Sequence, residues 1–388
     1  MNFDPVAATA AYIDSLGPEA LAKAQAYTVG SHWLLLWNLL VSAAVAWLLV
    51  RWGVLDRLNA RVARRGPNLR AWVIAAAYFV LANVITLPWA LYEEWWRERS
   101  YGRTSQPLGD FLGQGMLSIA IFALLVGLFM IGVYALMRRA GRRWWIWSGG
   151  LTAGAMSVLL LAGPVFIEPL FNDYRPVPAG EVRDALVVMA ERAGVPTDRI
   201  FVYDGSRQSN NFTANVSGLA GSARIAISDV AFKGASLDEV KAVTGHEIGH
   251  YVLGHVWRTV ILMSVLAIAF FFLAERLFPR VARAFGSQSR IDEPTGLPVL
   301  AFMVSLFFLL AQPLLNASIR KGENEADQYS LETVNLPDAL ASALVKTAEY
   351  RYPRPSALQE ALFYTHPSVE RRVRRAMNWK ATHPPGQP

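Results

Sequence analysis

The chain contains no cysteine among its 388 residues. Disulfide bonds, thiolate nucleophiles and cysteine-based zinc sites are therefore excluded, and cysteine usage gives no sign of the redox compartment. Charged residues are also scarce, at 17% of the chain, whereas a typical soluble domain has about 25%. Together with 53% hydrophobic residues, this deficit indicates a membrane protein.

Six apolar runs approach the length that crosses a bilayer, about 20 residues of helix. A single run of this kind could be a buried core helix, but six of them predict a polytopic α-helical membrane protein. Many of the ends carry tryptophan, whose amphipathic ring is favoured at the membrane surface. The runs cover residues 32–50, 71–92, 111–137, 145–167, 259–274 (extendable back to Trp257) and 297–316.

The net charge of +7 is interpreted as loop arginines that orient the spans, so no nucleic-acid partner is expected. The loops 51–70, 138–143 and 275–296 would share one side of the membrane and contain fourteen Lys and Arg. The opposite side has only four, in the N-terminal segment and in 93–110. The positive-inside rule places the three loops with fourteen Lys and Arg in the cytoplasm. The two polar regions of the chain would then lie on the other side of the membrane.

Two polar regions interrupt the apolar pattern. Residues 178–195 have helical periodicity, and RIFVYD, NFTANVSG and ARIAISD then predict three short strands separated by turns. We therefore expect a mainly α fold with a small α/β catalytic domain. The predicted domains are an N-terminal tail (1–31), four spans (32–168), a catalytic α/β segment (169–258), two spans (259–316) and a helical C-terminal segment (317–388).

The sequence HEIGH places His246 and His250 four residues apart, on one face of a helix. Two imidazoles at this spacing can bind one metal ion, and Glu247 can then act as general base on a water molecule. Asp238 and Glu239 suit the first turn of the same helix. Two unrelated histidines flanking a glutamate are less favoured, because each position of the motif has its own task.

A catalytic zinc site takes three protein ligands. His255 is near but lies five residues after His250, about 140° round a helix, so we interpret it as an interface residue near the membrane. Glu323 and Asp327, four residues apart after the last span, are better candidates. A glutamate completes a two-histidine site, and a carboxylate one turn on can orient a ligand histidine. A solvated helix face would have the same spacing, so both interpretations stay open at this point.

Taken together, these motifs resemble the type I CaaX prenyl proteases and their bacterial relatives, which are integral-membrane zinc metallopeptidases. That family pairs H-E-x-x-H with a later E-x-x-x-D, matched by Glu323 and Asp327, and with a later H-P, matched at His366. LPWALYEEWWRERSYG (87–102) and IEPLFNDYRPVPAGEVRDAL (167–186) also resemble family segments. The resemblance runs in one order over roughly residues 75–375.

The resemblance implies a zincin-like site with one Zn²⁺ per chain. His246, His250 and Glu323 would be the metal ligands. Glu247 would be the general base, His366 would stabilise the oxyanion, and Asp327 would hold a ligand histidine.

The resemblance also implies that the substrate peptide adds as a strand to a sheet edge, where main-chain pairing gives sequence-tolerant binding. The implied substrate-binding residues are Ala214, Asn215, Val216 and Arg372.

Three features depart from the family pattern. Eukaryotic members have seven spans, whereas six are found here; Thr213 replaces an expected asparagine in the edge strand; and Arg371 replaces an acidic residue. The change in the edge strand affects the expected substrate preference. Eukaryotic members also present the site to the cytosol, which conflicts with the positive-inside count, so the side of the membrane stays open.

We therefore predict a membrane-embedded zinc metalloendopeptidase in the bacterial inner membrane. Its substrates would be membrane-attached or hydrophobic proteins, with prenylated CaaX-type proteins as one class. A quality-control protease without prenyl specificity is the first alternative. An intramembrane protease is disfavoured because the charged stretch SLDEVK precedes the motif. A non-enzymatic chaperone or transporter is disfavoured because Glu247 is present and no internal symmetry is found.

Overall fold

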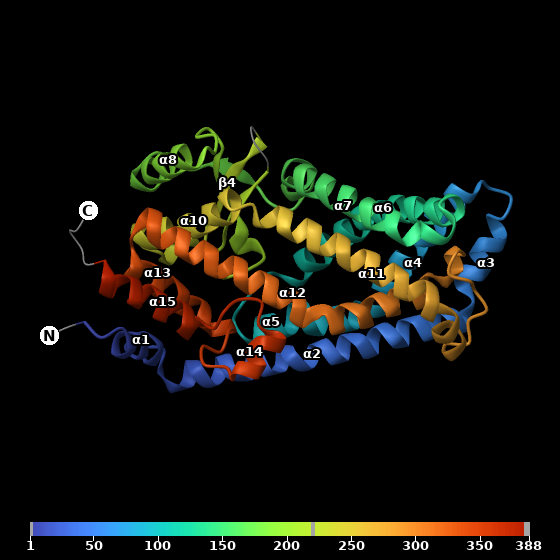
Figure 1. The fold of residues 1–388 in the computed structure, drawn as a ribbon, viewed down its shortest axis with the longest axis horizontal. Coiled ribbons are helices and arrows are strands. Elements are labelled where there is room, and N and C mark those ends of the chain that lie inside the picture. Colours follow the sequence, from blue (N-terminus) through green and yellow to red (C-terminus); the bar gives the residue numbers. More distant parts are fainter. Residues whose placement is uncertain (1–2, 219–221, 384–388) are drawn as a thin grey trace.

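The computed structural model describes residues 3–218 and 222–383 and is mainly helical (Figure 1). Its helices are α1 (Pro5–Asp14), α2 (Gly17–Trp52), α3 (Val54–Arg61), α4 (Pro67–Ala90), α5 (Arg97–Ser100), α6 (Leu108–Arg139), α7 (Trp144–Ala162), α8 (Glu181–Ala193), α9 (Ala231–Gly234), α10 (Leu237–Val252), α11 (His255–Ala284), α12 (Leu297–Val334), α13 (Pro337–Lys346), α14 (Ala357–Phe363) and α15 (Val369–Thr382). Two π-helical turns, Leu91–Trp96 and Gly163–Ile167, follow α4 and α7.

Six helical segments within the described residues are long and apolar enough to cross a membrane, which confirms the predicted fold class. They are Gly17–Trp52, Pro67–Ser100, Leu108–Arg139, Gly141–Leu170, His255–Ala284 and Pro294–Val334. Each is longer than its apolar run, because the helices continue into polar sequence at their ends.

The bundle packs α4 against α6 and α7 against α11, around a core that includes Tyr134, Trp144 and Phe278. Many apolar side chains point outward instead. Leu310 is 73% exposed and Trp33 is 60% exposed. Apolar surface on this scale is typical of a face that contacts lipid.

The small sheet lies at one end of the long bundle (Figure 1). Its strands are β1 (Tyr174–Pro176), β2 (Ile200–Tyr203), β3 (Ala214–Ser217) and β4 (Arg224–Ser228), in the order β1-β2-β4-β3. The central pair β2 and β4 is parallel, and the two outer pairs are antiparallel. The sequence predicted β2, β3 and β4 and missed the three-residue β1, which is too short to show a period.

Helix α12 continues without interruption from the membrane-spanning run into the segment that carries Glu323 and Asp327. The predicted domain boundaries at residues 31, 258 and 316 likewise fall inside α2, α11 and α12. These boundaries therefore mark changes in composition and not breaks in the backbone.

The N-terminal segment, predicted as a tail, forms α1 and the start of α2. Helix α1 packs on α15, and Ile13 lies in a core with Leu340, Val373 and Met377. The two ends of the chain thus fold together at the catalytic end of the molecule (Figure 1).

Candidate active site

Helix α10 begins with a reciprocal cap. Ser236 Oγ accepts from the backbone N–H of Glu239, and the Glu239 carboxylate accepts from the backbone N–H of Ser236. The same carboxylate accepts from Ser342 Oγ and Lys346 Nζ, both at 2.7 Å. Although burial raises the pKa of Glu239, these hydrogen bonds outweigh it and lower the pKa overall. The start of the motif helix is therefore fixed to α13.

Two glycines of the motif region bring α10 into close contact with α12. A Cβ on Gly245 would lie 2.6 Å from Val334 Cγ2, and one on Gly249 would lie 3.1 Å from Ala326 Cα. Side chains at these positions would force the helices apart. The close packing carries the histidines of α10 to the carboxylates of α12.

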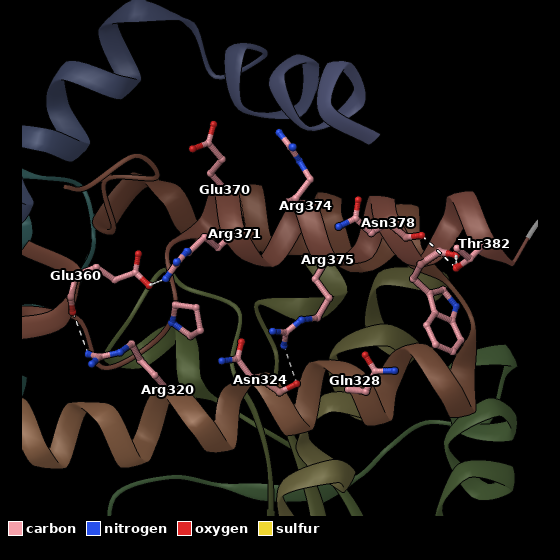
Figure 2. Close-up of a pocket in the computed structure, with 12 residues that line it drawn as sticks. Arg320, Asn324, Gln328, Glu360, Glu370, Arg371, Arg374, Arg375, Asn378 and Thr382 are labelled. Atoms are coloured by element: carbon pink, nitrogen blue, oxygen red, sulfur yellow. Dashed lines mark hydrogen bonds and ion pairs between the residues drawn. The ribbon is translucent and has the colours of Figure 1, made fainter. Parts of the chain in front are cut away.

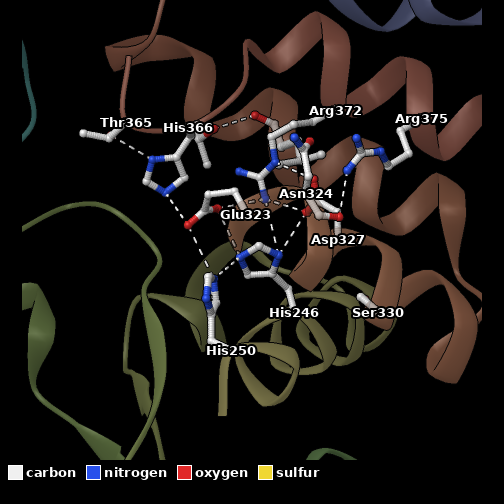
Figure 3. Close-up of polar contacts among 12 residues, drawn as sticks. His246, His250, Glu323, Asn324, Asp327, Ser330, Thr365, His366, Arg372 and Arg375 are labelled. Carbon is white, nitrogen blue, oxygen red and sulfur yellow. Dashed lines mark hydrogen bonds and ion pairs between the residues drawn. The ribbon is translucent and has the colours of Figure 1, made fainter. Parts of the chain in front are cut away.

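Three potential ligand atoms converge where the helices meet (Figure 3). The Nε2 atoms of His246 and His250 are 3.1 Å apart, and they lie 3.3 Å and 3.4 Å from the two carboxylate oxygens of Glu323. The three residues form a group whose ligand atoms all lie within 4.8 Å of one another. Residues predicted from two distant sequence segments are thus brought together.

These distances fit a tetrahedral metal ion. Ligands about 2.0–2.1 Å from such an ion lie about 3.3 Å from one another. In the described part of the chain, Glu323 Oε2 is buried without a hydrogen-bond partner. A cation among two facing imidazole nitrogens and a buried carboxylate would satisfy all three groups. The donor set therefore suits a divalent metal.

Asp327 fixes the ring of His246. Its Oδ1 lies 2.9 Å from His246 Nδ1, so Nε2 is left to face the cluster. Arg372 donates two hydrogen bonds to Asp327, from Nε at 2.8 Å and from Nη2 at 2.6 Å. Burial lowers the pKa of His246, but the two carboxylates Asp327 and Glu323 raise it overall to about 9.

His255 fixes the other histidine. Its Nδ1 lies 2.8 Å from His250 Nδ1, and its Nε2 lies 3.0 Å from Glu325 Oε2. The sequence analysis placed His255 away from the site because it treated residues 246–255 as one helix. In the structure α10 ends at Val252, and Gly254 adopts a left-handed φ of 64° before α11 begins. This break in the helix turns His255 back toward His250.

A cavity of about 460 Å³ opens beside the cluster and is lined by Glu247 and His366, among others. Glu247 is half-buried, and burial raises its pKa. His366 Nε2 lies 3.1 Å from Glu323 Oε1, and Thr365 Oγ1 lies 2.9 Å from His366 Nδ1. Burial lowers the pKa of His366 to about 4, so its ring is neutral at neutral pH.

The predicted substrate-binding residues differ in whether they line this cavity. Ala214 lines the cavity, whereas Asn215 and Val216 are not among the described residues that line it. Among the described residues, strand β3 is nevertheless the outermost strand of the sheet and pairs with β4. Arg372 lines the cavity as well, although its guanidinium is bonded to Asp327.

Comparison with known families matches nearly the whole chain. Residues 176–380 match the model of peptidase family M48, and residues 6–173 match the CAAX prenyl protease N-terminal domain, described as five membrane helices. In this protein residues 6–173 contain four candidate spans. The missing span accounts for the six found here in place of seven.

Individual relatives agree with the family models. The uncharacterized metalloprotease YhfN of Bacillus subtilis (strain 168) is 25% identical over 374 residues, covering 92% of this chain and 86% of the relative. CAAX prenyl protease 1 of Saccharomyces cerevisiae is 31% identical over 232 residues, covering 54% and 50%.

The fold is shared with a solved structure. The crystal structure of S. mikatae Ste24p matches with a TM-score of 0.74 at 20% identity, covering 92% of this chain and 88% of that one. The family expected from the motifs is confirmed, and it implies a metal ion and protein or peptide substrates. The chain therefore belongs to peptidase family M48 and is a multi-pass membrane metalloendopeptidase.

Proposed function

We propose that the protein binds one zinc ion through His246, His250 and Glu323 and hydrolyses peptide bonds beside it. The observation that carries this proposal is the set of ligand-to-ligand distances of 3.1, 3.3 and 3.4 Å. Two histidines and one glutamate are a donor set that suits zinc. A zinc ion there would polarise the scissile carbonyl and lower the pKa of a water molecule toward about 7.

The side chains around this cluster would transfer the protons and stabilise the oxyanion. Glu247, which lines the cavity, would take a proton from the attacking water and return it to the leaving amine. His366 would donate a hydrogen bond from Nε2 to the oxyanion, because Thr365 Oγ1 can donate to its Nδ1 and leave the proton on Nε2. Loss of such a donor typically costs about 3–4 kcal/mol of barrier.

The substrate would bind as an extra strand along β3. Ser228 N donates to the carbonyl of Thr213, so the backbone of Thr213 faces β4. Because backbone groups alternate along a strand, those of Ala214 and Val216 face the open edge. The backbone of Asn215 faces β4, so the main-chain hydrogen bonds to the substrate would come from Ala214 and Val216.

We propose that the substrates are membrane-attached or hydrophobic proteins. The cavity lies where α10 and α12 meet, and α12 continues directly into the membrane-spanning segment. Several relatives are named CAAX prenyl proteases, so prenylated CaaX-type proteins are one candidate class. Proteolysis of damaged membrane proteins is the second candidate, supported by the departures at Thr213 and Arg371. We propose a bacterial inner membrane as the location, because a bacterial relative covers 92% of the chain and the candidate spans are helical.

The test uses the full-length protein purified in detergent. Cleavage of casein, of a farnesylated CaaX peptide and of the same peptide without the lipid would be followed with and without a chelator. Glu247→Gln would be assayed in parallel, with the metal identified and counted by mass spectrometry. Asp238→Asn is the matched control, because this exposed carboxylate lies on the same helix and its ion pair is with the neighbouring Lys241.

We expect wild type and Asp238→Asn to cleave, and Glu247→Gln to keep one zinc while losing activity. Preference for the farnesylated peptide would assign the prenyl class, and equal cleavage of casein would favour quality control. A protein that retains no metal, or a Glu247→Gln variant that cleaves like wild type, would refute the assigned site.

A further inference from the structure

A second, basic groove lies between α12 and α15, and its lining does not include the metal ligands. It has a volume of about 820 Å³. Figure 2 shows Arg371 and Arg375 extending from α15 toward α12, where Arg320, Asn324 and Gln328 point into the same space. Helix α12 therefore has two polar faces. These three side chains face the groove, whereas Glu323 and Asp327 face the metal cluster.

The groove has more positive than negative charge. Arg371 Nη1 pairs with Glu360 Oε1 at 3.0 Å. Arg320 donates to the carbonyls of Glu360 and Tyr364, and Arg375 donates to the carbonyl of Asn324 at 2.8 Å. Within the described residues, no carboxylate forms an ion pair with Arg320 or Arg375 at 4.0 Å or less. Each guanidinium has five N–H donors, so most of these donors are left for a ligand.

Exposed apolar side chains on two helices indicate that the inner end of the groove lies near the surface of the bilayer. The exposed apolar residues of α12 continue to Ile319, one position before Arg320. Helix α14, which packs on α12, exposes Leu358 (70%) and Leu362 (36%) on either side of Glu360. Exposed leucine and isoleucine side chains therefore lie beside the polar groove at this end.

An aromatic contact also indicates that this part of the molecule lies near the membrane surface. The ring of Phe363, at the end of α14, stacks on His32 of α2 with 4.2 Å between centroids. The next residue, Trp33, is exposed at the start of the first apolar run, and tryptophan is favoured at the membrane surface. The headgroup layer extends about 5–7 Å beyond the hydrocarbon, and four helical residues rise about 6 Å. Arg320 and Asn324 therefore fall within the headgroup layer.

We propose that this groove binds the phosphate of an anionic phospholipid from the leaflet on the catalytic side. A guanidinium fork matches the geometry of phosphate and forms strong charge-assisted hydrogen bonds. Arg320, Arg371 and Arg375 would bind the headgroup, while Leu358 and Leu362 contact the acyl chains. An acidic peptide would also pair with the arginines, but the apolar rim at the membrane end favours a lipid. The site is independent of the proteolytic chemistry.

The test measures lipid binding to the full-length, delipidated, chelated protein by native mass spectrometry. The probes are phosphatidylglycerol, phosphatidylcholine and inorganic phosphate. We expect phosphatidylglycerol to bind most tightly, and Arg371→Gln with Arg375→Gln to weaken it roughly thirty-fold, since each arginine near an anionic surface contributes roughly fivefold. Lysine at both positions keeps the charge but not the bidentate fork, so the affinity of that variant should lie between those of wild type and the glutamine variant. Arg175→Gln, an exposed arginine of the α/β segment, is the matched control.

Equal binding of the two lipids would overturn the proposal, and so would wild-type affinity in the double glutamine variant. Inorganic phosphate binding as tightly as phosphatidylglycerol would show a site for soluble anions and refute the lipid assignment. If the glutamine variant fails to fold, the lysine variant decides instead. Retained preference for phosphatidylglycerol in that variant supports a charge-based headgroup site, and loss of the preference refutes it.

Discussion

Replacing Asp327 with asparagine tests the support of the metal cluster most directly. Asp327 is 1% exposed, and its two oxygens bind Arg372 and His246. Asparagine has nearly the same shape but no charge. The change therefore leaves the buried guanidinium of Arg372 without its bidentate partner, and the other carboxylate nearby is Glu323 Oε2, at 3.6 Å.

Two separate losses are expected from this substitution. Breaking a buried ion pair by removing one partner costs about 3–5 kcal/mol of folding stability. Asparagine keeps one neutral acceptor and places an NH2 donor where the second carboxylate oxygen was, so it cannot hold His246 and Arg372 together as Asp327 does. The weaker support of the His246 ring should lower metal affinity by about 10–100-fold, or about 1.4–2.8 kcal/mol. Adding Arg372→Gln to Asp327→Asn removes the uncompensated charge, so the double variant should be less destabilised than the sum of the two single variants.

The assay separates the two losses. Thermal unfolding of the chelated protein in detergent reports folding stability, and competition with a chromophoric chelator reports metal affinity. If Asp327→Asn unfolded like wild type and bound the metal with unchanged affinity, the reasoning about the buried pair would be wrong. Strictly additive effects of Asp327→Asn and Arg372→Gln would show that the two side chains are not coupled.

Three further predictions follow from the contacts around the cluster. His255→Ala removes the partner of His250 Nδ1 and should weaken metal binding about tenfold or more in the chelator competition. Gly249→Ala places a Cβ 3.0 Å from Tyr329 Cβ, and this overpacking should cost about 1–3 kcal/mol in thermal unfolding. Glu239→Gln should cost about 1–3 kcal/mol at neutral pH. Because the folded-state pKa of Glu239 is below its ordinary value of 4.5, its contribution is complete above that value and is lost as the pH falls through the lower folded pKa. The difference from wild type should therefore shrink in acid.

Two of these three predictions have a control variant within the chain. Gly154→Ala lies in α7 with open space at the Cβ position and should not destabilise, whereas equal loss at both glycines would contradict the packing argument. Asp238→Asn controls for Glu239→Gln, and a gap between Glu239→Gln and wild type that widened in acid would have the wrong sign. Unchanged metal affinity in His255→Ala would mean that its contact with His250 is incidental.

The spans and the motif helix could be predicted from the sequence because their signals are local. Hydropathy over about 20 residues and a spacing of four residues on one helix face need no tertiary information. The first ligand pair, His246 and His250, depends only on such spacing. Glu323 could not be assigned as a ligand from spacing alone, because an acidic helix face has the same pattern whether it faces a metal or water.

The remaining contacts depend on how distant segments pack. Arg372 is far from Asp327 in sequence, and only the approach of α15 to α12 brings its guanidinium to that carboxylate. His255 was misplaced because a helix end at Val252 redirects it, although Gly254 in VLGH was a local signal for such an end. The strand residues Asn215 and Val216 were chosen by resemblance, and residue-level contacts at a sheet edge depend on strand register.

The continuity of α12 fixes how far the catalytic centre stands from the membrane. Adding one residue between the apolar run and Glu323 would rotate that carboxylate by about 100° and move it about 1.5 Å along the axis, away from both histidines. Seven added residues would restore its direction to within about 20° but raise it by roughly 11 Å. The histidines stand on α10, which joins the separate span α11. The height of peptide cleavage above the bilayer can therefore change only if α11 and α12 are lengthened together, by amounts that restore the direction of Glu323.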